Sequence, residues 1–288
     1  MTDEQFGKFP ISEFSLDEMC EDASIILIAK RGSGKSWITR AIMHKLGYKP
    51  FGIVISPTEK DNPFYSKFFP DSFIYHNYDT KIITKILNRQ RTMLKKQRDK
   101  EAEGKKIDPS GIVVMDDCLA SKGAWAKDPN IADLLMNGRH RKLTYILTMQ
   151  FPLGISPELR ANFDYIFLLA DDVVSNLKRI YEHYAGMFPN FESFRQVFQQ
   201  LTEDHGAMVI KNRGERSSLL DKIGYYKAPD LSDRDFMFGC SQFKKYHKNN
   251  YNSEWEDDKY KIMNIEQMLI NNKKNKTKLD IRKISKDI

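Results

Sequence analysis

The stretch IILIAKRGSGKSWITR, residues 25–40, restricts the possible folds of this chain more than any other part of the sequence. The aliphatic run Ile25 to Ile28 is followed by a turn with two glycines and then by a helix-like pattern from Trp37 to Leu46. A buried strand, a glycine-rich turn and a helix in this order are typical of α/β proteins. The turn contains Ala29, Lys30, Arg31, Gly32, Ser33, Gly34, Lys35 and Ser36.

This turn has the residues of a P-loop, which binds the phosphates of a nucleotide. Glycines let successive backbone N–H groups point inward around a phosphate, and the following helix adds the favourable dipole of its N-terminus. We expect Lys35 to reach the β- and γ-phosphates and Ser36 to ligate Mg²⁺. Ala29 stands where the stricter pattern has its first glycine, at a position that needs only a small side chain. We therefore predict that residues 29–37 bind ATP with Mg²⁺.

A second stretch, GIVVMDDCLA, offers carboxylates to such a site. Ile112 to Met115 form a predicted buried strand whose end presents Asp116 and Asp117. We expect Asp116 to hold Mg²⁺ through water and Asp117 to polarise the attacking water. Paired acids at a strand end also occur in solvated turns and helix caps, but a P-loop in the same chain favours the catalytic interpretation. Asp117 is shorter than the glutamate that many ATPases use at this position.

The third stretch is a predicted strand from Leu143 to Met149 that ends at Gln150. A polar side chain there is expected to face the γ-phosphate and to sense whether it is present. Arg139 and Arg141 precede this strand, and Arg160 follows it. An arginine that reaches the γ-phosphate of a neighbouring subunit stabilises the transition state by about 10³- to 10⁵-fold in rate, which requires an oligomer. The alternative for each arginine is a surface or structural ion pair.

Short β-branched runs alternate with helical patterns along most of the chain. This alternation predicts an α/β fold of the P-loop NTPase type (ASCE/RecA-like), with a mostly parallel sheet and helices on both faces. A helix is expected from residue 81 to about 103, because its apolar residues fall on one face and its lysines on another. The predicted strands are Ile25 to Ala29, Gly52 to Ser56, Phe73 to Tyr75, Ile112 to Met115, Thr144 to Met149, Tyr165 to Leu169 and Ala207 to Ile210.

The composition changes near residue 240. We predict a P-loop ATPase domain over residues 1–239 and a basic C-terminal tail over 240–288, partly helical or disordered. The net charge of +7 is concentrated in residues 241–288, with 12 Lys and Arg against 7 Asp and Glu, and in residues 89–106, with 8 against 3. Basic segments of this kind attract phosphate backbones, although solvated charge also keeps proteins soluble.

Other features exclude several classes of protein. No run of about 18 apolar residues appears, and the polar start MTDEQFGKFP lacks the features of a signal peptide. The three cysteines, Cys20, Cys118 and Cys240, are far apart, which favours reduced thiols over disulfides or a metal site. Aromatic residues recur at helix-like spacing between Tyr181 and Phe198, where packing is a better interpretation than base stacking.

Together the motifs resemble the FtsK/HerA superfamily of DNA-pumping ATPases. The resemblance is strongest to the genome-packaging ATPase of poxviruses and other large nucleocytoplasmic DNA viruses, and it covers about residues 14–215. It rests on AKRGSGKS, on SPT after the second strand, on IVVMDDCLA, and on NGRHRKLTYILTMQ followed by LRANFDYIFLL. In the superfamily an arginine lies eleven residues before the strand-end glutamine, which maps the trans-acting finger to Arg139, with Arg141 and Arg160 as weaker candidates.

The resemblance implies a homo-oligomeric ring, pentameric or hexameric, that threads double-stranded DNA into a preformed capsid with ATP and Mg²⁺. Viral capsid or portal proteins would be its partners, without stable transmembrane insertion. Its place would be the host cytoplasm, at a viral factory, or the virion. Residues 122–127 and the helix around Lys85, Lys95 and Lys96 are candidates for gripping DNA phosphates. The alternatives are a nucleoside or nucleotide kinase, and a nucleotide-gated DNA-binding protein with little turnover.

Overall fold

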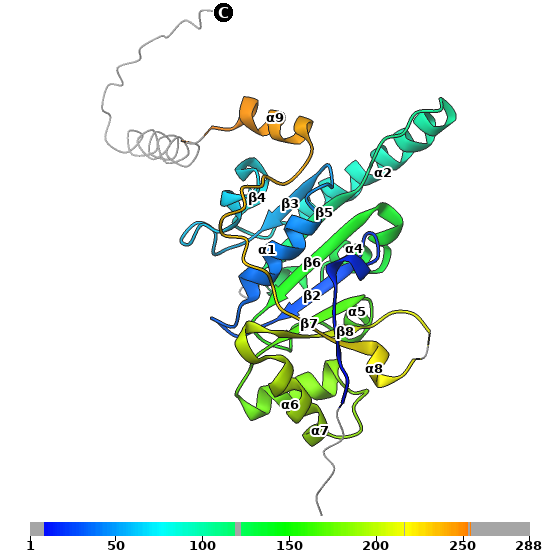
Figure 1. Cartoon of the computed structure of the whole chain (residues 1–288). Coiled ribbons are helices and arrows are strands. Elements are labelled where there is room, and N and C mark those ends of the chain that lie inside the picture. The colour runs from blue at the N-terminus through cyan, green and yellow to red at the C-terminus, as the bar shows by residue number, and fades with distance from the viewer. Residues whose placement is uncertain (1–8, 119–121, 216, 253, 255–288) are drawn as a thin grey trace, which may run out of the picture. The chain divides into compact units, whose positions relative to one another are not determined.

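The computed structural model describes residues 9–118, 122–215, 217–252 and 254, and it divides the chain into two compact units at His247. The described strands form one nine-stranded sheet (Figure 1). They are β1 (Ser12–Glu13), β2 (Ser24–Ile28), β3 (Gly52–Ile55), β4 (Ile74–Tyr75), β5 (Gly111–Asp116), β6 (Leu143–Met149), β7 (Tyr165–Leu169), β8 (Ala207–Lys211) and β9 (Ile223–Tyr226).

The order of strands across the sheet is β1-β9-β8-β7-β2-β6-β5-β3-β4. All pairs from β7 to β4 are parallel, whereas β8 runs antiparallel to both β7 and β9. The predicted α/β P-loop NTPase fold is confirmed, and every predicted strand is present. The strands β1 and β9 were not predicted, because β1 has two residues and β9 is a four-residue run interrupted by Gly224.

Helices cover both faces of the sheet. The α-helices are α1 (Lys35–Lys45), α2 (Thr80–Ala102), α3 (Lys122–Trp125), α4 (Pro129–Asn137), α5 (Pro157–Arg160), α6 (Val174–Tyr184), α7 (Phe191–Leu201), α8 (Leu219–Lys222) and α9 (Ser241–Asn250). Successive residues of a strand point to opposite faces, so β2 serves two cores. Ile26 and Ile28 pack with residues of α2, α4, α6 and α7, whereas Ile25 and Leu27 pack with residues of α1.

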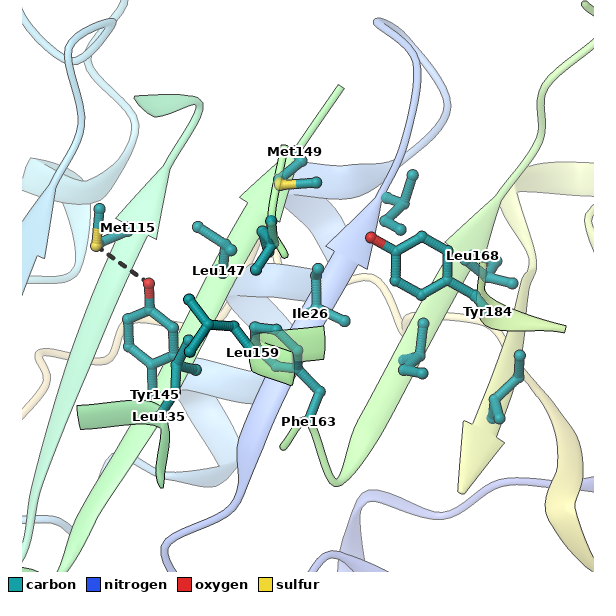
Figure 2. Packing of buried hydrophobic residues seen from close by; sticks show 14 of the residues in the cluster. Ile26, Met115, Leu135, Tyr145, Leu147, Met149, Leu159, Phe163, Leu168 and Tyr184 are labelled. Carbon is teal, nitrogen blue, oxygen red and sulfur yellow. Dashed lines mark hydrogen bonds between the residues drawn. The ribbon is translucent and has the colours of Figure 1, made fainter. Parts of the chain in front are cut away.

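The first of these cores is continuous beneath β2, β5 and β6. Figure 2 shows its centre, where Tyr145 lies beside Leu135 and Phe163 near Leu159. The Tyr145 hydroxyl is fully enclosed and donates a hydrogen bond to Met115 Sδ at 3.1 Å. A buried hydroxyl is tolerated only with a partner, so this contact permits a tyrosine inside an otherwise apolar layer. The core thereby fixes β5 against β6, the two strands that carry the polar groups described below.

Helix α2 is anchored only over its first half. The Asp79 side chain accepts a hydrogen bond from Lys81 N at 2.8 Å and caps the start of the helix. Its buried residues are Ile83, Ile86, Leu87 and Gln90, and none is buried beyond Gln90. Figure 1 shows the second half extending away from the sheet. The helix predicted from residue 81 to about 103 is therefore present, and its basic second half is exposed.

Helix α9 begins just after the boundary predicted at residue 240. Phe243 is buried, and its ring stacks on Phe73 with centroids 4.2 Å apart. The division into domains at residues 239 and 240 stays a prediction, and most of the predicted tail lies outside the described residues. Within the described part of the chain, no helix combines the length and apolar character needed to cross a membrane.

Candidate nucleotide-binding site

The P-loop leaves β2 at the carboxyl edge of the sheet. Gly32 and Gly34 have φ values of +77° and +101°, which residues other than glycine rarely adopt. Gly34 is the N-cap residue of α1, and no side chain caps the free N–H groups of the first turn. A Cβ atom at Gly32 would meet nothing within 4 Å, so the turn is open on that side. This open turn with free N–H groups fits an anionic ligand such as a phosphate.

Lys35 lies against both carboxylates of the second predicted stretch. Its Nζ atom forms ion pairs with Asp117 Oδ1 and, at 3.4 Å, with Asp116 Oδ1. The three side chains are only 12 to 15% exposed. Lys35 Nζ is thus held by two carboxylates, which a bound phosphate would have to replace as its partners. The structure thus brings together three of the residues predicted to be catalytic.

The neighbouring strand β6 places Gln150 beside them. In the sheet β6 lies between β2, which leads to the P-loop, and β5, which ends at Asp116. Gln150 Nε2 donates a hydrogen bond to Asp117 Oδ2 at 2.9 Å. Asp117 has a φ of +49°, in the left-handed region that aspartate tolerates better than most residues. Gln150 therefore contacts the acid expected to polarise water, and its predicted role as a γ-phosphate sensor stays a prediction.

Two hydroxyl groups that the sequence analysis did not assign hold Asp116 in place. Thr148, in β6, donates a hydrogen bond to Asp116 Oδ1 and accepts one from the Asp117 N–H at 3.3 Å. Ser56, which directly follows β3, donates to Asp116 Oδ2 at 3.3 Å. Both come from strands adjacent to β5. For Ser56 the available signal was a polar residue at the end of a strand, whereas Thr148 lies inside β6.

The convergent residues line a cavity of about 1030 Å³. Ala29 and Ser33 are buried beneath the turn and do not line it. Its two side walls are residues 58–64, which follow β3, and a group around Asp204 and Lys227 at the far end. The residues predicted for the site that line the cavity are Lys30, Arg31, Gly32, Gly34, Lys35, Ser36, Trp37, Asp116, Asp117 and Gln150.

Glu59 is a further acid at this cavity, although its role is structural. It is buried, and its carboxylate accepts hydrogen bonds from the backbone N–H groups of Phe64, Tyr65 and Ser66 at 2.8 to 3.0 Å. These contacts cap the short helix η2 (Tyr65–Lys67). Because both oxygens are engaged, Glu59 is a weaker candidate for a general base than Asp117.

The three candidate arginines have different surroundings. Arg139 lies in η5 (Arg139–Arg141), before β6, so the length of β6, roughly 20 Å, separates it from Gln150. It is exposed and forms no ion pair with the described residues. Arg141 pairs with Asp133 at 2.6 Å, and the Arg160 guanidinium lies 5.6 Å from the centre of the Tyr184 ring. The cavity in this protomer therefore lacks all three arginines.

The environment of the carboxylates suppresses thiol chemistry. Burial, followed by the charge of Asp116, raises the pKa of Cys118 to about 12. Burial also raises the pKa of Tyr65, with Asp116 as the second cause. Both groups stay protonated at neutral pH, so Cys118 is not a nucleophile there.

Among the described residues, no cluster of three His, Cys, Asp or Glu side chains could hold a metal ion.

Comparisons with known proteins show relatives in large DNA viruses and a shared fold. Protein L437 of Acanthamoeba polyphaga mimivirus is 50% identical over 96% of both chains. Protein 075L of invertebrate iridescent virus 6 is 35% identical over 81% of this chain and 88% of its own. The fold is shared with a solved structure, the genome packaging NTPase B204 of Sulfolobus turreted icosahedral virus 2 in complex with AMP. The TM-score is 0.51 and the sequence identity 15%, and the match covers 74% of this chain and 100% of the B204 chain. No family model matches the chain.

Proposed function

We propose that this chain, which belongs to the family of large-DNA-virus proteins that includes mimivirus L437 and iridescent virus 075L, is an ATP-driven motor that moves double-stranded DNA into a preformed capsid. The resemblance to viral packaging ATPases inferred from the sequence is supported by these relatives from large DNA viruses and by the fold shared with B204. The observation that carries the proposal is the convergence, at one cavity, of Lys35, Asp116, Asp117 and Gln150.

The geometry supports nucleotide hydrolysis at this cavity. The free N–H groups at the start of α1 would bind the phosphates of ATP, and Lys35 would exchange its carboxylate partners for phosphate oxygens. Ser36 and Asp116 would hold Mg²⁺, which neutralises phosphate charge. Once Asp117 is released from Lys35, it would be free to orient the attacking water. The hydrogen bond from Gln150 connects Asp117 to the end of β6. Thr148 and Ser56 keep Asp116 oriented.

Arg139 is the best candidate to complete the site from a neighbouring subunit. Arg141 and Arg160 already have partners within their own protomer, whereas Arg139 is exposed and unpaired among the described residues. Its position at the amino end of β6 prevents it from serving the cavity of its own protomer. A ring of subunits in head-to-tail contact would bring this edge to the next cavity. This supports a homo-oligomer in which hydrolysis depends on assembly.

The exposed second half of α2 supports contact with DNA phosphates. Arg91, Lys95, Lys96 and Arg98 are all at least partly exposed there, and no ion pair engages them within the described chain. Contacts of this kind are independent of base sequence and weaken with salt. The logarithm of the affinity falls with the logarithm of the salt concentration, with a slope of about 0.9 per phosphate contacted. The other candidate, residues 122–127, adjoins residues 119–121, which lie outside the described residues, as does the Lys122 side chain.

The test measures the ATPase rate per subunit against protein concentration, with and without duplex DNA at low salt. The rate should rise with concentration and again with DNA. Arg139→Ala should lose about 10³- to 10⁵-fold in rate with ATP binding intact. Arg195→Ala is the matched control, because within the described part of the chain Arg195 pairs with Glu192 alone, at 2.9 Å on α7, and does not line the cavity. A rate indifferent to concentration and to DNA would contradict the motor.

The same preparation distinguishes the alternatives. A nucleoside or nucleotide kinase would transfer phosphate from ATP to a nucleoside or nucleotide and would not respond to DNA. A nucleotide-gated DNA-binding protein would bind ATP but show less than one turnover in a single-turnover experiment. The motor requires repeated turnover and no phosphorylated acceptor.

A further inference from the structure

The cavity extends well beyond the phosphate-binding turn, and the sheet order fixes its direction. Asp116 ends β5 and Gln150 directly follows β6, and both strands lie on one side of β2. The strands β7, β8 and β9 lie on the other side of β2. If the triphosphate end of a nucleotide meets the carboxylates, the rest of the molecule must extend toward β8 and β9. The antiparallel pairing of β8 brings its start and the end of β9 to this edge, because Ala207 pairs with Tyr226.

The segment before β8 is held in an unusual conformation against the P-loop. Asp204 and His205 are consecutive non-glycine residues with φ values of +54° and +62°. Such backbone is rare outside glycine, and it tends to persist at functional sites. The Cβ of His205 lies 3.2 Å from the place that a Cβ of Gly34 would occupy. This turn therefore sets the His205 side chain at the edge of the phosphate-binding loop, and both residues line the cavity.

The residues after β9 complete this end of the cavity. Lys227, Ala228 and Asp230 line the same end of the cavity. Lys227 Nζ lies 3.3 Å from Asp204 Oδ2, so an ion pair joins the two segments. Trp37 also lines the cavity and is 49% exposed. The corner thus combines the His205 ring with exposed donors and acceptors, which suits a flat heteroaromatic ring that carries polar edges.

We propose that the corner formed by Asp204, His205 and Lys227 is the nucleoside end of the site, where the base stacks on the His205 ring. The inference rests on the proposed nucleotide binding and adds the residues that recognise the base. Asp204 offers an acceptor, and Lys227 a donor, to the polar edge of the base.

The experiment compares binding of a non-hydrolysable ATP analogue with binding of inorganic tripolyphosphate, which has no base. His205→Asn removes the ring, and asparagine tolerates the left-handed backbone. This variant should bind the analogue roughly 5- to 150-fold more weakly and tripolyphosphate as tightly as the parent does. His183→Asn is the matched control, since His183 is exposed on α6 and does not line the cavity.

Two results would overturn the inference. Equal weakening of both ligands would mean that His205 acts on the P-loop through Gly34, and unchanged binding of both would mean that it contacts no base. Failure of the parent to bind either ligand would remove this inference together with the proposed function. Base-dependent binding without DNA-stimulated hydrolysis would instead refute the motor and leave the nucleoside end standing.

Discussion

Replacing Thr148 by valine tests whether the acidic pair is held by the hydroxyl of β6. Thr148 is completely buried, donates to the Asp116 carboxylate and accepts from the Asp117 N–H at 3.3 Å. A hydrogen bond to a charged group contributes about 1.5–3 kcal/mol and one between neutral groups about 0.5–1.5 kcal/mol. Valine has nearly the same shape, so little packing is lost. Thr148→Val should therefore lower the free energy of unfolding by about 2–4 kcal/mol.

Thr144 supplies a matched control in the same strand. It is 1% exposed, four residues before Thr148 and therefore on the same face of β6, and its hydroxyl has no hydrogen-bond partner among the described residues. Removing a buried, unpaired hydroxyl relieves a desolvation penalty. Thr144→Val should leave the free energy of unfolding unchanged or raise it by about 1–3 kcal/mol.

Urea titrations of the two variants give the comparison directly. The midpoint should fall for Thr148→Val and hold or rise for Thr144→Val, with the same slope in both. The Mg²⁺ concentration that gives half-maximal ATPase rate should rise for Thr148→Val alone, because Asp116 loses its orienting partner. Equal destabilisation by both substitutions would show that shape, and not the hydroxyl contact, holds the pair.

With the pKa of Cys118 at about 12, iodoacetamide at pH 8 should label this thiol only after unfolding, and native labelling at the rate of a free thiol would contradict its burial. The unfolded thiol ionises from about pH 9.0, so the stability of the parent relative to Cys118→Ala should fall as pH rises towards about 12. Lys49 and Asp22 form a buried ion pair at 2.7 Å, so Lys49→Met alone should lower the free energy of unfolding in urea by about 3–5 kcal/mol. Adding Asp22→Asn should restore much of this loss, and additive losses would refute the pairing. Gly34→Ala should weaken binding of an ATP analogue in calorimetry, because its φ is +101°, whereas Gly123→Ala, with nothing within 4 Å, should bind as the parent does.

The parts of the fold that sequence could predict are those with a strong local pattern. The buried runs in β2, β5 and β6 are apolar and β-branched over five to seven residues, so their strands stand out. By contrast β1 has two exposed residues, and it exists because β9 offers it a parallel edge. Such a pairing depends on contacts across more than 200 positions, and local sequence does not record it.

The site shows the same difference. Lys35 lies in the turn that follows one predicted strand, and Asp117 and Gln150 lie at the ends of two others. Because the carboxyl ends of parallel strands meet at one edge, their proximity could be predicted. Thr148 could not be distinguished from a core threonine such as Thr144. The neighbouring strand β5 places the Asp116 carboxylate beside the Thr148 hydroxyl and, among the described residues, no partner beside that of Thr144. His205 depends on a left-handed turn that its sequence, EDHG, does not specify. These residues act through contacts between segments far apart in the chain.

The most direct test of the central claim, that two protomers complete each site, mixes two inactive variants. Lys35→Ala lacks the phosphate-binding lysine but keeps Arg139, and Arg139→Ala has the converse defect. In randomly mixed rings of equal parts, a site is active when an intact P-loop meets an intact arginine, which predicts about a quarter of the parental rate per site. A mixture no more active than its separate components would contradict a shared site.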